Sequence, residues 1–157
     1  MTPKPSAGLL LYRTTHGDLE VMLLHMGGPF WQRKDAGAWS IPKGEYDPSE
    51  QPLAAARREF AEETGLVAPP GEPIDLGDVR QSSGKLVHAW AQHADVDVTK
   101  ITSNSFAMEW PKGSGRMREF PEVDRAGWFD LETAREKLVK GQVPFLQALA
   151  ALVQERS

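Results

Sequence analysis

The sequence predicts a single mixed α/β domain that spans residues 1–157. The length is close to the roughly 150 residues of a typical domain, and no linker or internal repeat divides the chain. Strand-like apolar runs lie on both sides of one amphipathic helical pattern, and two further helical patterns end the chain. The four clearest strand-like runs cover residues 7–12, 19–24, 74–80 and 85–96.

The N-terminal strands are joined by residues 14–18, whose polar residues and glycine are typical of a hairpin turn. Residues 27–37 begin and end with stretches that contain glycine, so we expect this segment to be a loop. A short apolar step follows at residues 39–41.

The central helix is expected over residues 49–64. Pro52 suits its first turn, Ser49 or a neighbour is expected to cap it, and Gly65 supplies a stop signal. One apolar stripe follows helical spacing and should face the core. It consists of Leu53, Ala56 and Phe60.

The C-terminal half begins with the turn at residues 82–84, between the third and fourth strand-like runs. Residues 99–122 are polar and contain several glycines and prolines, so this long segment is predicted to be mostly loop. A last strand is expected at residues 125–129, followed by helices at residues 131–140 and 144–154.

The composition excludes several classes of protein. Apolar residues make up 40% of the chain and charged residues 25%, which disfavours disorder, and the longest apolar run is too short to span a membrane. A net charge of −4 provides no electrostatic surface for duplex nucleic acid. The absence of cysteine and of an N-terminal apolar stretch favours a cytoplasmic protein. We expect a small-molecule partner, and a monomer and a homodimer both stay open.

Three carboxylates gather on one side of the predicted central helix. Glu59, Glu62 and Glu63 follow the i, i+3, i+4 spacing of helical neighbours, where like charges repel. Glu62 and Glu63 also lie in the last turn, where the helix dipole disfavours anions. A solvated acidic face is the ordinary explanation of such a cluster, but a hard divalent cation would also compensate its charge.

The acids are part of a longer pattern at fixed spacing, which resembles the Nudix box of the Nudix hydrolases. Its nine defined positions are Gly44, Glu50, Arg58, Glu59, Phe60, Glu62, Glu63, Gly65 and Leu66. The box covers residues 44–66, and the strands around it look like the rest of that domain.

This resemblance implies an α/β/α sandwich around a mixed β-sheet and the hydrolysis of a phosphoanhydride bond with Mg²⁺ or Mn²⁺. By position, Glu59 and Glu63 would be direct metal ligands, and Glu62 a further ligand or a group that orders metal-bound water. The carbonyl of Gly44 would be a fourth contact. Glu50 and Arg58 would hold the box together through an ion pair.

The substrate stays open between several phosphoanhydrides. Residues 39–44 read Trp-Ser-Ile-Pro-Lys-Gly, which is similar to the segment before the box in dinucleoside polyphosphate hydrolases and some oxidised-nucleotide pyrophosphatases, and makes Lys43 a phosphate contact. Residues 82–84 lack the Tyr of the dinucleoside tetraphosphate enzymes and the Pro of the ADP-ribose enzymes. A dinucleoside polyphosphate is preferred, with an oxidised (d)NTP, a nucleotide sugar or ADP-ribose as alternatives. A non-catalytic nucleotide-sensing module is disfavoured because all four box glutamates are intact.

Outside the box, loop residues supply further candidates for substrate binding. Arg33, Lys34 and Arg116 are candidates for holding a polyphosphate, against the ordinary explanation of solvated loop charges. Trp110 is the preferred candidate for stacking on a nucleobase, ahead of Trp31 and Trp90, whereas Trp39 and Trp128 are expected in the core.

The resemblance also implies one acid from a loop opposite the box, as a general base or an extra ligand. Glu109, Glu119 and Glu122 lie in the right segment, and we favour Glu122 because it leads into the strand that carries Trp128.

Overall fold

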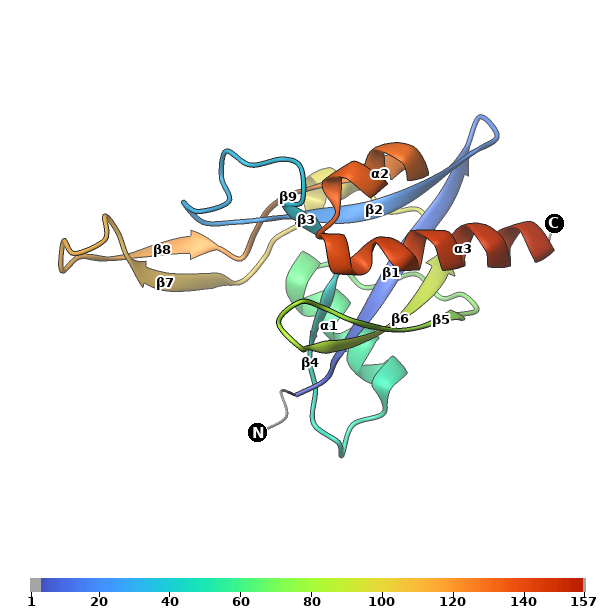
Figure 1. Ribbon diagram of the computed structural model, residues 1–157, viewed down its shortest axis with the longest axis horizontal. Coiled ribbons are helices and arrows are strands. Elements are labelled where there is room, and N and C mark those ends of the chain that lie inside the picture. Colours follow the sequence, from blue (N-terminus) through green and yellow to red (C-terminus); the bar gives the residue numbers. More distant parts are fainter. Residues whose placement is uncertain (1–3, 157) are drawn as a thin grey trace.

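The computed structural model describes residues 4–156, and its elements follow the predicted order closely (Figure 1). The strands are β1 (Ser6–Thr15), β2 (Asp18–Met26), β3 (Trp39–Ser40), β4 (Lys43–Glu45), β5 (Ile74–Arg80), β6 (Leu86–His93), β7 (Ser105–Glu109), β8 (Met117–Pro121) and β9 (Val123–Asp130). The α-helices are α1 (Pro52–Thr64), α2 (Leu131–Lys137) and α3 (Val143–Arg156), and two short 3₁₀ helices are η1 (Val98–Lys100) and η2 (Lys140–Gln142).

The main sheet is mixed and has β1 near its centre. Strand β1 runs parallel to β6 on one edge, whereas its other edge pairs antiparallel with β4 at the start of the strand and with β2 at its end. The hydrogen-bonded order is β3-β2-β1-β6-β5, and β9 pairs antiparallel with β2. The short strands β3 and β4 therefore occupy the space between β1 and β2 where these two strands no longer pair.

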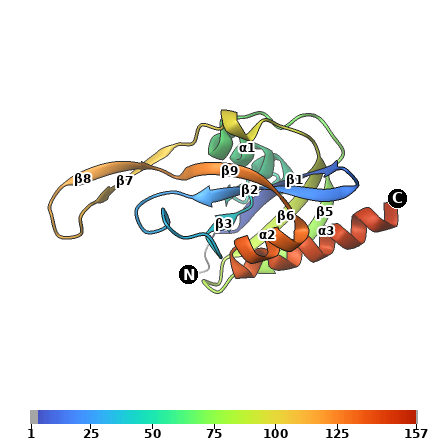
Figure 2. The same ribbon diagram turned by 90° about the horizontal axis from the view of Figure 1, so that it is seen from above.

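Both faces of the sheet are buried, because apolar residues follow one another without interruption in β1. Leu9 and Leu11 point into a core beneath α1, whereas Leu10 points into a second core beneath α2 and α3. Phe60 of α1 fills the first core and Phe145 of α3 fills the second. Figure 2 shows α1 on one face of the sheet and the other two helices on the opposite face, so the predicted α/β/α sandwich is confirmed.

The prediction that residues 99–122 are mostly loop is wrong. Strands β7 and β8 pair within this segment into a separate two-stranded sheet, which projects from the domain in Figures 1 and 2. Phe106 and Phe120 lie opposite each other in the register, with their ring centroids 6.1 Å apart. The glycines and Pro111 that suggested a long loop form only the turn between the strands.

The start of α1 differs from the prediction in one detail. Pro52 occupies the first turn as expected, but Gln51 takes the capping position and makes no side-chain capping hydrogen bond, so Ser49 lies too far upstream to cap. At the other end Gly65 adopts a φ of +71° and donates its N–H to the carbonyl of Ala61, which confirms the stop signal.

The C-terminal helices are close to their predicted positions. Asp130 caps α2 by accepting a hydrogen bond from the N–H of Thr133 at 2.7 Å. The helix ends earlier than expected because Leu138 is extended and bridges Trp39 of β3. Between residues 4 and 156, no helix combines the length and hydrophobicity needed to cross a membrane.

Candidate active site

The site is built where β4 meets α1, and the carboxylate of Glu59 in α1 lies directly against Gly44 of β4. A β-carbon placed on Gly44 would lie 2.0 Å from Oε2 of Glu59, so the carboxylate occupies the space that any larger residue would need. The side chain of Glu59 is only 12% exposed, and this burial raises its pKa. A glycine is therefore required in β4 to admit the glutamate from α1.

Arg58 connects the other box acids to one another. Its Nε and Nη2 donate to the two carboxylate oxygens of Glu50 at 2.8 and 2.9 Å, which is the expected ion pair in bidentate form. Its Nη1 donates to Glu59 at 2.8 Å and to Glu62 at 3.1 Å. These hydrogen bonds lower the pKa of Glu50 and raise that of Arg58. One guanidinium thus relieves most of the repulsion that the sequence predicted on this face.

Glu63 lies apart from this network and faces a cavity of about 170 Å³. Lys43 of β4 and Glu122 line the same cavity, together with an apolar wall. That wall is made by Leu24, Met26 and Val123, with Ser40 beside it. Burial, reinforced by the charges of Glu122, Glu59 and Glu62, raises the pKa of Glu63 to about 7, although Lys43 opposes the shift.

Lys43 is the cation of this cavity. Its burial lowers its pKa, and nearby Lys85 lowers it further, whereas Glu63 and the neighbouring acids act in the opposite direction. Lys85 itself lies 3.8 Å from the carboxylate of Glu45, the residue that ends β4. The cavity therefore brings together two acids and a half-buried ammonium, and clusters of groups with shifted pKa values are typical of functional sites.

The donor set partly fits a divalent cation. Carboxylate oxygens are the ligands that Mg²⁺ prefers, and Glu63 is a half-buried carboxylate with three further acids nearby, Glu122, Glu59 and Glu62. Over residues 4–156, however, no three acidic or histidine side chains are grouped tightly enough to hold a metal ion, because Glu59 and Glu62 are turned toward Arg58. Mg²⁺ commonly takes only one or two carboxylates and completes its shell with substrate phosphates and water. The residues therefore fit a metal that binds together with its substrate.

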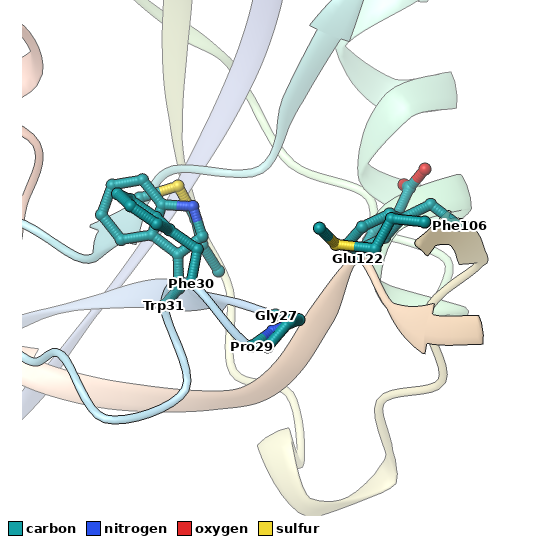
Figure 3. A pocket seen from close by; sticks show the side chains of 9 residues that line it. Gly27, Pro29, Phe30, Trp31, Phe106 and Glu122 are labelled. Carbon is teal, nitrogen blue, oxygen red and sulfur yellow. The ribbon is translucent and has the colours of Figure 1, made fainter. Parts of the chain in front are cut away.

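A second, apolar cavity of about 460 Å³ adjoins the first and shares Met26 and Glu122 with it. Figure 3 shows Phe30 and Trp31 on one side of this cavity, with Phe106 and Glu122 on the other. The remaining lining is small or apolar and comes from Gly27, Gly28, Pro29 and Met108. The charged cavity and the apolar cavity thus meet at Glu122.

The structure separates the three acids considered for the loop position. Glu122 lines both cavities. Glu109 instead accepts a hydrogen bond from the N–H of Gly113 within the β7–β8 turn, and Glu119 is exposed on β8. The geometry thus favours Glu122 for this role.

The structure does not bring the other substrate-binding candidates together. Trp110 and Arg116 bond to each other through their backbones at the turn of the projecting hairpin and do not line either cavity that contains Glu122. Arg33 is exposed in the loop of residues 27–37. The ammonium of Lys34 lies 3.6 Å from the centre of the Phe30 ring, at the rim of the apolar cavity.

The sequence reasoning missed most of the apolar cavity. Phe30 and Trp31 are adjacent aromatic residues in a loop, and their ring centroids lie 4.9 Å apart in a T-shaped contact. Their adjacency in the sequence was the pattern that could have indicated an aromatic pocket. No such pattern indicated Phe106, because its segment was predicted to be a loop. Its ring reaches the cavity by packing against Gly28.

Comparison with known proteins agrees with this architecture. The sequence matches the model of the NUDIX domain over residues 2–149. An Ap4A hydrolase of C. elegans, solved as a binary complex, is 22% identical with a TM-score of 0.70, and the alignment covers 96% of this chain and 98% of that one. A mutT/nudix family protein of Listeria innocua is 18% identical with a TM-score of 0.65, covering 99% and 97% of the two chains. The NUDIX domain of Shewanella oneidensis NrtR, complexed with ADP ribose, is 16% identical with a TM-score of 0.61, covering 100% and 91%.

One further relative differs in kind. A Myxococcus xanthus protein described as an octanoyltransferase is 34% identical over 102 residues, which are 65% of this chain and 25% of the relative. The match thus spans about a quarter of that protein, and it gives no reason to assign acyl transfer to this chain.

Proposed function

Since the chain belongs to the NUDIX domain family, we propose that it hydrolyses a phosphoanhydride bond of a nucleoside polyphosphate with Mg²⁺ or Mn²⁺. The observation that carries this proposal is the meeting of two unlike cavities at Glu122. One is charged and suits phosphates with their cations, and the other is apolar and suits a flat ring. A molecule with a polyphosphate joined to a nucleobase fits both at once.

The apolar cavity supports a nucleobase in three respects. Its volume of about 460 Å³ falls within the usual range of small-molecule pockets. Phe30 and Trp31 provide ring surfaces on one side, and Phe106 closes the other (Figure 3). The position proposed for stacking therefore moves from Trp110 to these residues.

In the charged cavity each residue has a proposed role. Glu59 and Glu63, with Glu62 and the carbonyl of Gly44 as further contacts, would hold the metal, which when bound neutralises phosphate charge and lowers the pKa of water. Lys43 binds a phosphate oxygen. Glu122 accepts the proton of the attacking water.

Among substrates, a dinucleoside polyphosphate is the first choice. The segment of residues 39–44 and the likeness in fold to an Ap4A hydrolase support it. An oxidised (d)NTP, a nucleotide sugar or ADP-ribose stays the alternative, and the likeness to a domain solved with ADP ribose supports the last of these.

A substrate screen with purified protein and Mg²⁺ tests the proposal. Dinucleoside polyphosphates, oxidised and normal dNTPs, ADP-ribose and diphosphoinositol phosphates would each be incubated, and the products separated by chromatography. Hydrolysis that disappears with a chelator and in Glu63→Gln would support the proposed function. Metal-independent turnover would contradict the proposed metal dependence. No turnover with any nucleotide would contradict the proposed hydrolysis and favour a nucleotide-sensing module.

The same screen tests the base pocket. Phe106→Ala should raise KM for the preferred nucleotide about tenfold, because base stacking on an aromatic ring contributes roughly 1–3 kcal/mol. Met117→Ala, at an exposed position on β8, is the matched control.

A further inference from the structure

His25 is completely buried at the end of β2, and both of its ring nitrogens are hydrogen-bonded. Its Nδ1 lies 2.7 Å from Oδ1 of Asp124 in β9, and its Nε2 lies 2.6 Å from the carbonyl oxygen of Lys34 in the loop of residues 27–37. The ring therefore bridges two segments that are far apart in the sequence.

Both partners accept hydrogen bonds and neither donates one. A carbonyl oxygen has no proton, and an ionised carboxylate accepts hydrogen bonds without donating any. The guanidinium of Arg125 lies 3.6 Å from the same Asp124 oxygen. A neutral imidazole carries only one N–H, so it would leave a lone pair facing an acceptor at hydrogen-bond distance. A doubly protonated ring donates to both.

We infer that His25 is a buried imidazolium that positions the nucleobase pocket relative to Glu122. Its Lys34 bond holds the loop that carries Phe30 and Trp31. Its Asp124 bond holds the start of β9, two residues after Glu122. His25 is thus a positioning residue, and this role in catalysis rests on the proposed function.

Neighbouring contacts show that the bridge is part of a fixed assembly. The N–H of Gly27 donates to the carbonyl of Glu122 at 2.9 Å, so loop and strand also meet through their backbones. The ring of Trp39 packs edge-on against His25 with centroids 5.0 Å apart, and its indole N–H donates to Asp35 at the end of the loop. Lys137 pairs with Asp35 at 2.8 Å. The charged groups around the bridge are therefore Asp124 and Arg125 on one side and Asp35 and Lys137 on the other.

Nuclear magnetic resonance of the ¹⁵N-labelled imidazoles tests the protonation state without any substrate. In the metal-free wild type at neutral pH, both ring nitrogens of His25 should show the shifts and couplings of N–H groups. In Asp124→Asn, which keeps an acceptor oxygen but removes its charge, one nitrogen should lose its proton. A wild-type ring with a single N–H would overturn the imidazolium.

Amide hydrogen exchange tests the positioning. The amides of Gln32 and Lys34 are hydrogen-bonded within the loop and should exchange about tenfold faster in Asp124→Asn, since a charge-assisted hydrogen bond is lost. Unchanged exchange would overturn the role of His25 in holding the loop. Asp75→Asn is the matched control, because it changes another Asp–His pair in the same way. Asp75 lies on β5, the edge strand of the sheet, and its Oδ1 is 2.7 Å from Nε2 of His88.

Steady-state kinetics, with the substrate found in the screen, test the link to the nucleobase pocket. Asp124→Asn should raise KM at least fivefold and change kcat less, whereas Asp75→Asn should change neither, and unfolding curves would confirm that both variants fold. An equal KM in Asp124→Asn and wild type would overturn the link to the nucleobase pocket. If no nucleotide is hydrolysed, the proposed function fails, while the spectroscopic and exchange results still decide whether His25 holds the loop.

Discussion

The carboxylate of Glu59 takes the place of a side chain on Gly44. A β-carbon on Gly44 would lie 2.0 Å from Oε2 and 2.1 Å from Cδ of Glu59. Gly44 does not have a positive φ, so its substitution would meet this contact and no backbone strain. The glycine of the box is therefore explained by the glutamate that follows it fifteen positions later.

Gly44→Ala should leave the protein folded and nearly inactive. The displaced group is the end of a flexible side chain, so stability should fall by no more than about 1 kcal/mol. A misplacement of about 1 Å can nevertheless cost roughly 10²-fold in rate. Steady-state kinetics and thermal unfolding would measure the two effects. A double-mutant cycle with Glu59→Ala supplies the control, since Gly44→Ala should have little further effect when the carboxylate is absent.

Glu63→Gln should reduce turnover by several orders of magnitude and keep the fold. The amide keeps the size of the side chain, but it removes a proposed metal ligand and a charge that is poorly solvated. Thermal unfolding of the metal-free variant should therefore occur at an equal or slightly higher temperature than in the wild type. Near-normal Mg²⁺-dependent activity would contradict the ligand role.

The stability of the metal-free protein should depend on pH through Glu63. Burial raises the pKa of this carboxyl from its ordinary 4.5 to about 7, so between these values the folded state keeps a proton that the unfolded chain releases. The free energy of unfolding should consequently fall as the pH rises through this window, by at most about 3 kcal/mol. Denaturant titrations with a chelator at several pH values would measure the slope, and Glu63→Gln should flatten it.

Pro52, the apolar stripe and Gly65 predicted the helix and its stop, and the resemblance to the Nudix box implied the ion pair between Glu50 and Arg58. All of these depend on residues close in sequence. None of them predicted that Glu63 lies apart from the Arg58 network. Nor did they predict that Glu122 lines the same cavity as Glu63, which depends on β9 pairing with β2. Pairing between distant strands leaves no local pattern in the sequence.

The protein's second cavity was hidden for a similar reason. Turn residues dominate the segment around Pro111, and they led to the prediction of a loop. The alternation that makes Phe106 and Met108 face one side of β7 is too short to outweigh them. His25 also gave no signal, since its two acceptors come from a loop carbonyl and from a strand about a hundred residues away.

Lys43→Ala should raise KM for polyphosphate substrates more than it lowers kcat. Lys43 is half-buried and lines the same cavity as Glu63 and Glu122, where its ammonium is the cation best placed to meet a phosphate. Loss of one charge-assisted hydrogen bond corresponds to roughly a tenfold rise in KM. Lys4→Ala is the control, because Lys4 forms only an exposed ion pair with Asp47. An unchanged KM would mean that Lys43 serves the fold and does not contact phosphate.

Glu122→Gln should lower kcat by about 10²-fold or more, as expected for a general base, and leave Mg²⁺ binding measurable by calorimetry. The base has to reach water from an element other than α1, and Glu122 lines the same cavity as Glu63. The variant keeps its backbone contact with Gly27, so the fold should not change.

Glu109→Gln and Glu119→Gln are the matched controls for this last prediction. Both residues lie on the projecting hairpin, where Glu109 accepts a bond from Gly113 and Glu119 faces solvent, so kcat should change only by a factor of about two. A larger loss in Glu109→Gln than in Glu122→Gln would mean that the hairpin turn folds over the metals during turnover. If all three variants kept wild-type rates, Glu62 or the metal alone would have to activate the water, because the remaining acid of the cavity, Glu63, is the proposed ligand.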